Sequence, residues 1–308
     1  MASGGSPIPK PSCGAAPHYC GRPFTQEEIE LIRRLISAEP RPNRAQLARK
    51  VCEALRWVGP GAALKDMSCR VPFAANGPML RMEKDGLIEL PPPQHGNGNG
   101  NIRPSLTAAS APGQPVTDSA GRLGKLQLCP VATPQQSSLW NELIQRHHYL
   151  GYQPLPGAQI RYLIFSANSQ LLAAIGFGAA AWKVAPRDHF IGWNPEQRAQ
   201  NLHRVVNNAR FLILPWVNSR NLASKILALA AKRLASDWHA RYQYTPVLLE
   251  TFVERQLFSG ASYRAANWVH ICQTQGRGKL DRQHKNAQPI KDIYLYPLHK
   301  HFRQTLQS

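Results

Sequence analysis

A low-complexity stretch in the first half of the chain constrains its fold more than any other feature. Residues 91–136 begin with three prolines, continue with alternating glycine and asparagine, and contain no aromatic side chain. Such a segment buries too little apolar surface to offset the entropy that is lost on ordering. We therefore predict a disordered linker over residues 92–136. It divides the 308-residue chain into a flexible N-terminus (1–23), a small domain (24–91) and a larger domain (137–308).

The charge balance narrows the class of partner. Lys and Arg number 37 against 18 Asp and Glu, which gives a formal net charge of +19. Residues 138–308 hold 21 of the basic and 8 of the acidic side chains. An excess of this size opposes compact folding by self-repulsion, and a polyanion usually compensates it. We therefore expect DNA as the partner.

The apolar runs and the cysteines indicate the cellular compartment in which the protein works. No run of 18 or more apolar residues is present, and the N-terminus lacks the pattern of a signal peptide, so we expect a cytoplasmic protein without a membrane partner. The six cysteines form no C-x-x-C pair and are interpreted as reduced thiols. The alternative is that Cys13, His18 and Cys20 form half of a zinc site.

Helix signals dominate residues 24–91. Thr25 and Glu28 match a capping box, and an apolar stripe follows it from Ile29. A second helix is expected from about Asn43 to Trp57. A third apolar segment then leads through a Gly-containing turn at residue 86 into a short strand. This order predicts a winged helix-turn-helix.

A winged helix would place its third helix in the major groove of DNA. Arg70, Arg81 and Lys84 would then face the groove, while Arg44 and Arg49 would contact phosphates. The alternative is a three-helix bundle that serves only for protein contacts.

Strand and helix signals alternate after the linker. Strands are expected at 161–166 and 170–178, a helix at 194–202, a strand at 208–215, a long helix at 219–238, a strand at 246–252, a helical turn near 260–265 and a strand at 267–274. This order predicts an α+β layer with a mixed sheet and covering helices. It resembles the N-acetyltransferase-like (GNAT) fold.

The GNAT resemblance implies a loop that holds acetyl-CoA. In GNAT enzymes a strand leads into Gln/Arg-x-x-Gly-x-Gly/Ala, whose amides bind the pyrophosphate at a helix N-terminus. Here the loop falls at residues 218–225, where Asn218 and Asn221 replace two motif residues and only Ala223 fits. The Asn221 side chain blocks the close approach that glycine permits. We therefore expect the fold without acetyl-CoA.

The chain as a whole resembles the DruA family, named for the Druantia anti-phage defence system and also found with mobile elements. The resemblance is carried by Trp57 and by the strings Gly21-Arg22-Pro23-Phe24-Thr25, Cys69-Arg70, Gly86-Leu87-Ile88-Glu89-Leu90-Pro91, His148-Tyr149-Leu150-Gly151-Tyr152, Arg210-Phe211-Leu212, Glu250-Thr251-Phe252, Asn267-Trp268 and Thr274-Gln275-Gly276-Arg277-Gly278. It implies a bacterial, nucleoid-associated protein that works on DNA in defence or transposition, and it carries over no catalytic residue.

Two groups of residues are candidates for chemistry. A Tyr149 hydroxyl beside His148 could attack a phosphodiester and form a phosphotyrosine, with Tyr263 as a further candidate; the alternative is a buried His that holds a loop. Asp188 and Glu250 could bind Mg²⁺ for phosphodiester cleavage. Alternatively these carboxylates pair with Arg210 or Arg264 inside the fold.

Basic and aromatic residues gather near the C-terminus. Arginine and lysine would neutralise phosphates while tryptophan or tyrosine stacks on an unpaired base. The candidates in the larger domain for nucleic-acid contact are Arg187, Arg210, Arg220, Arg264, Trp268, Arg277, Lys279, Arg282 and Lys285.

These observations favour a DNA-processing protein of a mobile element or of anti-phage defence, which cuts or transfers a strand as an endonuclease or recombinase would. The first alternative is a DNA-binding module without chemistry that recruits a helicase or transposase partner. The second alternative is a GNAT-type acyltransferase. The sequence leaves open whether the chain forms a homo-oligomer.

Overall fold

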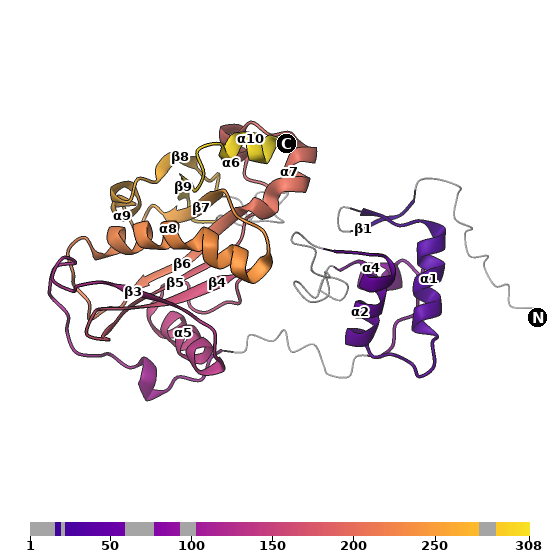
Figure 1. The fold of residues 1–308 in the computed structure, drawn as a ribbon, viewed down its shortest axis with the longest axis horizontal. Helices are drawn as coiled ribbons and strands as arrows, with labels where there is room; N and C mark the ends of the chain where they lie inside the picture. The colour runs from indigo at the N-terminus through magenta and orange to yellow at the C-terminus, as the bar shows by residue number, and fades with distance from the viewer. Residues whose placement is uncertain (1–15, 20–21, 59–76, 93–102, 277–287) are drawn as a thin grey trace, which may run out of the picture. The chain divides into compact units, whose positions relative to one another are not determined.

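A computed structural model describes residues 16–19, 22–58, 77–92, 103–276 and 288–308 of the chain (Figure 1). The chain divides into two compact units, the first within residues 1–96 and the second mainly within residues 97–308. Among the described residues, no helix is long and apolar enough to cross a membrane.

Three helices and a two-stranded hairpin make up the described part of the first unit. Thr25 and Glu28 form the predicted capping box at the start of the first helix, and Asn43 and Gln46 form another at the start of the second. The elements are β1 (His18–Tyr19), β2 (Arg22–Pro23), α1 (Gln26–Ile36), α2 (Arg44–Ala54) and α4 (Pro78–Lys84).

One apolar core holds these helices together. Ile32 of α1, Leu47 of α2 and Met82 of α4 are fully buried in it. The ring of Phe24 packs edge-on against Trp57, with centroids 5.6 Å apart. The predicted apolar stripe therefore does face a core.

The predicted wing is absent from the described residues of this unit, where no strand follows α4. Residues 87–90 are irregular: Arg33 Nε donates to Leu87 O, and Leu90 N donates to Glu83 Oε1. Pro91 and the proline after it lack the N–H groups that a strand ladder needs, so a strand over residues 87–90 could not extend its pairing through them. The winged helix remains a prediction.

A seven-stranded mixed sheet organises the second unit, in the order β3-β4-β5-β6-β7-β9-β8. The neighbouring strands β6 and β7 are parallel and every other pair is antiparallel. The strands are β3 (Gln127–Pro130), β4 (Ile160–Phe165), β5 (Leu171–Ala179), β6 (Val205–Ile213), β7 (Leu248–Glu254), β8 (Val269–Gln273) and β9 (Lys291–Pro297).

Helices pack against this sheet. The longest joins β6 to β7, as a crossover between parallel strands requires. The helices are α5 (Pro134–His147), α6 (Ala185–Ile191), α7 (Pro195–Asn201), α8 (Leu222–Tyr242), α9 (Ala261–Ala265) and α10 (Phe302–Gln307), with short 3-10 turns at Ala108–Ser110 and Leu202–Arg204. The α+β fold with a large mixed sheet confirms the prediction, although α6, β9 and α10 were missed.

A close approach fixes the position of α5. The indole N–H of Trp140 donates to Ile175 O at 3.3 Å, and the ring lies over Gly176 of β5. A Cβ at residue 176 would lie 2.7 Å from the ring. Only glycine therefore permits this contact between α5 and the sheet.

The predicted linker needs correction from residue 103 onward. Val116 forms a bridge with Val217, and Leu123, Leu126 and Leu128 are buried in the core of the second unit. Lys225 Nζ donates to Ala120 O at 2.8 Å. The segment lacks aromatic residues, but its spaced aliphatic side chains gain burial against α8 and its preceding loop, which offsets the ordering entropy.

Candidate functional site

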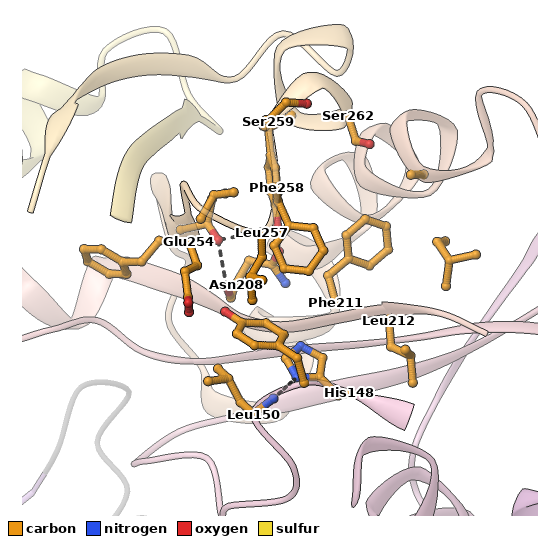
Figure 2. A pocket seen from close by; sticks show the side chains of 18 of the residues that line it. His148, Leu150, Asn208, Phe211, Leu212, Glu254, Leu257, Phe258, Ser259 and Ser262 are labelled. Carbon is orange, nitrogen blue, oxygen red and sulfur yellow. Dashed lines mark hydrogen bonds between the residues drawn. The ribbon is translucent and has the colours of Figure 1, made fainter. Parts of the chain in front are cut away.

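A cleft opens where the parallel strands β6 and β7 part. The strands pair from Val205↔Leu248 to Asn207↔Glu250, and both then continue without pairing to each other. The space between them has a volume of about 620 Å³. Figure 2 shows side chains from β6, from β7 with the turn after it, and from the loop after α5 around this one space.

A bulge in β6 accompanies the opening. Gly176 pairs with Arg210 and Phe177 pairs with Asn208, so Ala209 has no partner on β5. A bulge bends the strand that carries it and re-aims its side chains. The bend coincides with the point at which β6 leaves β7.

A buried polar network stiffens the floor of the cleft. The Tyr263 hydroxyl donates to Asn208 Oδ1 at 2.7 Å, and the Thr251 hydroxyl donates to Asn208 O at 3.0 Å. Burial raises the pKa of Tyr263 well above its ordinary value. The predicted catalytic role of Tyr263 is corrected here, because its phenol is enclosed, neutral and held by Asn208.

His148 lies at the mouth of the cleft, immediately after the last residue of α5. Its Nδ1 accepts a hydrogen bond from Leu150 N at 3.2 Å, and its ring stacks on Tyr149 with centroids 4.9 Å apart. Burial, together with the positive charge of Arg210, lowers the pKa of His148 to about 4. The imidazole is therefore neutral at neutral pH.

Tyr149 also lines the cleft. Its ring meets Phe258 edge-on at 5.3 Å, and its hydroxyl interacts with the carboxylate of Glu254 at the end of β7. Burial and the negative charge of Glu254 raise the pKa of Tyr149. A raised pKa disfavours the phenolate that a nucleophilic tyrosine needs.

Arg210 is a half-buried cation beside these two rings. Its Nη1 donates to the carbonyl of Ala209 at 2.7 Å, and its buried Nε has no partner. Burial lowers its pKa. Among the described residues, no carboxylate forms an ion pair with Arg210.

The predicted carboxylate pair lies elsewhere, around a buried arginine. Glu250 Oε2 accepts from Arg187 Nη1 at 2.8 Å, and Glu250 Oε1 accepts from Ala181 N at 2.8 Å. Asp188 accepts from Arg187 and from Arg198. Both carboxylates are therefore held within the fold, which is the alternative the sequence left open, with Arg187 in place of Arg210 or Arg264.

This arrangement corrects three assignments. Glu250 is fully enclosed, and burial raises its pKa although Arg187 and the Ala181 amide oppose the rise. Arg187 is fully buried and cannot contact phosphates. In the described parts of the chain, no three His, Cys, Asp or Glu side chains are grouped to hold a metal ion, so the Mg²⁺ role for Asp188 and Glu250 has no geometric support.

The remaining predicted contacts fall into three groups. Trp268 is buried with its ring against Tyr263, so it cannot stack on a base. Arg49, Arg81, Lys84, Arg220 and Arg264 are exposed, and Arg44 is half-buried with Nε donating to Pro91 O. Arg70, Arg277, Lys279, Arg282 and Lys285, and also Cys13 and Cys20 of the zinc alternative, lie outside the described residues.

The loop before α8 departs from the motif that holds the pyrophosphate of acetyl-CoA in GNAT enzymes. Asn221 has the left-handed backbone of the motif glycine, with φ of 63°, but it carries a side chain. The amide of Asn218 donates to Val116 O, and Lys225 Nζ is held by Ala120 O and Gly124 O. Backbone carbonyls of the segment before β3 therefore already accept from the Asn218 amide and from the Lys225 ammonium group.

Sequence reasoning missed the residues that shape the cleft. Glu254, Phe258 and Asn208 are not among the site residues predicted from the sequence. The one available signal was topological: parallel strands joined by a helix open beyond their last paired residues, so residues after Asn207 and Glu250 were the place to search.

The family model described as Druantia protein DruA matches residues 81–287 of the chain. No curated protein matches. A solved spermidine N-acetyltransferase from Vibrio cholerae in complex with CoA and spermine is 9% identical, with 56% of this chain and 95% of that chain covered and a TM-score of 0.38. The V. cholerae spermidine/spermine N-acetyltransferase SpeG in complex with manganese ions is 8% identical, with 59% and 97% covered and a TM-score of 0.38. Likenesses at this level support no conclusion about activity.

Proposed function

The chain belongs to the DruA family, and from this membership we propose that it is a DNA-binding component of anti-phage defence. The second unit makes the contact with nucleic acid. We further propose that the first unit is a winged helix, as the sequence predicts.

The observation that carries the proposal is the excess of exposed basic over exposed acidic side chains on the second unit. Among its described residues, thirteen Lys and Arg side chains are exposed against two acidic ones, Asp118 and Glu196. Such a surface attracts the phosphate backbone and releases its counterions on contact.

The acidic side chains of this unit are mostly turned inward. Asp237 accepts from Tyr162 and Arg233, Glu142 accepts from Thr107 and Ser138, and Asp292 lies near His270. Glu250 and Asp188 hold Arg187 as described above. Because these carboxylates act inside the fold, they do little to neutralise the basic surface.

The geometry favours binding without strand cutting. Asp188 and Glu250 are already engaged by Arg187, and the pKa of Tyr149 is raised rather than lowered. We therefore take the module that recruits a helicase or transposase as the better of the hypotheses. The cleft beside α8 is the one feature that favours acyl transfer, and the loop at Asn218 opposes it.

The test is incubation of the full chain with labelled single- and double-stranded DNA, with Mg²⁺ or EDTA, followed over a range of salt. We expect binding that weakens steeply with salt, because log affinity falls linearly with log salt in proportion to the phosphates contacted. DNA should be recovered intact on a denaturing gel. No binding at low salt would contradict the proposal, and metal-dependent fragments would restore the DNA-processing hypothesis.

A further inference from the structure

We propose that the cleft between β6 and β7 binds one unpaired nucleotide of a DNA strand, with its base against the aromatic rings at the mouth and its phosphate on Arg210. The inference rests on the proposed function and names the part of the strand that the protein recognises.

Large apolar side chains are exposed together around the mouth of the cleft. The exposed fractions are 44% for Tyr149, 41% for Leu150, 54% for Leu257 and 48% for Phe258. A contiguous group of this kind usually marks a binding site. Figure 2 shows Leu150, Leu257 and Phe258 bordering the same space, with Phe211 beside them.

The rings at this mouth can hold the flat face of a base. Tyr149 and Phe258 are in edge contact, and Tyr149 also stacks on His148. Every nucleobase has a π-face, so a ring at such a position binds bases of any sequence. The cleft volume of about 620 Å³ lies in the range of small-ligand pockets, roughly 300–1,000 Å³.

Arg210 supplies the site for the phosphate. Arg210 lies in β6 between two residues that line the cleft, Ala209 and Phe211, and its Nη1 donates to Ala209 O at 2.7 Å. Its charge contributes to the lowered pKa of His148 and partly opposes the rise in the pKa of Tyr149. A buried charge without an ion partner is costly, and its Nε is a buried donor without an acceptor. A phosphate oxygen would provide both the charge and the acceptor.

Glu254 gives the cleft a preference among bases. Its carboxylate lines the cleft together with Tyr149, and a carboxylate has about four lone-pair sites with which it can accept from a donor on the base. Adenine and cytosine present an exocyclic amine, whereas thymine presents a carbonyl at the corresponding position. We therefore expect cytosine to bind better than thymine.

An unpaired base is required because the site is recessed between two strands of the sheet. A base inside a duplex is stacked and paired, so its faces cannot reach Phe258 or Tyr149 without extrusion. Single-stranded DNA avoids the energy needed for that extrusion.

The experiment measures the affinity of the full chain for a labelled twelve-residue cytosine strand and for an abasic strand of the same length. Phe258→Ala and Arg210→Met are compared with Trp182→Ala, an exposed aromatic away from the cleft, and Arg34→Met, an exposed arginine of the first unit. Thermal melting checks that each variant is folded.

We expect wild type to bind the cytosine strand at least fivefold more tightly than the abasic strand, within the range known for stacking of one base. Phe258→Ala should abolish that difference, Arg210→Met should weaken binding to both strands, and the two control variants should behave as wild type. Glu254→Gln should remove the preference for cytosine over thymine.

Equal binding of the cytosine and abasic strands by wild type, or an unchanged difference in Phe258→Ala, would overturn this inference while the proposed function stands. Binding of neither strand by wild type would overturn both.

Discussion

The two units differ most in where they keep their charged side chains. In the described residues of the first unit, eight basic and six acidic side chains are exposed, whereas the second unit exposes thirteen and two. The side chains that are both polar and buried in the described chain, from Ser110 to Asp292, all belong to the second unit. The net charge of the whole sequence therefore does not show that the first unit has a mixed surface and the second unit a basic one.

The difference also concerns the two interiors. The first unit closes around apolar side chains such as Ile32, Leu47 and Met82. The second unit buries Arg187 against Glu250, and it also leaves Arg210 half-buried. A mixed surface suits a partner protein, while an unopposed basic surface with a cleft suits a nucleic-acid strand.

The largest expected effect concerns the buried ion pair. Arg187→Met leaves the enclosed Glu250 carboxylate without its cation, and we expect the free energy of unfolding of the second unit to fall by about 3–5 kcal/mol. Calorimetry should show this loss in the transition of the second unit and leave that of the first unchanged. Arg187→Met combined with Glu250→Gln should recover most of the loss; no recovery would contradict the pairing.

Charge reversal compares how much the exposed basic residues of each unit contribute to DNA affinity. We expect Arg146→Glu, Arg220→Glu and Arg255→Glu together to weaken DNA binding by about tenfold or more and to make the salt dependence shallower by about 0.9 for each phosphate that the protein no longer neutralises. Reversal of Arg34, Lys50 and Lys84 on the first unit is the matched control. A larger loss of affinity in the control would assign DNA docking to the first unit, as the winged-helix prediction had it.

A smaller effect is expected at the start of α1. Thr25 accepts from Glu28 N and closes the capping box, so Thr25→Ala should lower the free energy of unfolding of the first unit by about 1 kcal/mol. DNA affinity should stay at the wild-type level. A change in affinity in this variant would show that the first unit takes part in binding.

The smallest effect is a pH dependence that only the second unit should show. The pKa of His148 is about 4 in the folded protein against an ordinary value of 6.5, so the unfolded chain binds the proton more readily. Stability should therefore fall as the pH drops below about 6.5 and level off near pH 4. His148→Gln should remove about 1 kcal/mol of this loss at pH 5 after allowance for solvent screening; an identical pH profile would contradict the burial of His148.

The sequence predicts the order of the elements well because local signals determine it. The capping box that Thr25 and Glu28 predict, for example, is present. Its largest error is the segment 103–126, whose composition resembles a linker. Val116 is buried where it bridges to Val217, about a hundred residues further on, and Leu123 is buried in the same core, with its carbonyl accepting from Ala167 N.

The candidate site was predicted only in part, and for a similar reason. His148 and Tyr149 were identified and do line the cleft. Glu254 and Phe258 were not, since their proximity to Tyr149 depends on where β7 leaves β6 and on the turn that follows. The sequence analysis offered an ion pair within the fold as one alternative for Glu250, but its partner Arg187 is set by tertiary packing.

One measurement tests most directly whether the second unit makes the contact with nucleic acid. The full chain is cross-linked to a photoreactive single strand of DNA at low salt, and the modified peptides are located by mass spectrometry. We expect the cross-links around the cleft, in the loop after α5 with Tyr149 and in the turn after β7 with Phe258. Cross-links confined to residues 24–91 would contradict this and return the contact to the first unit.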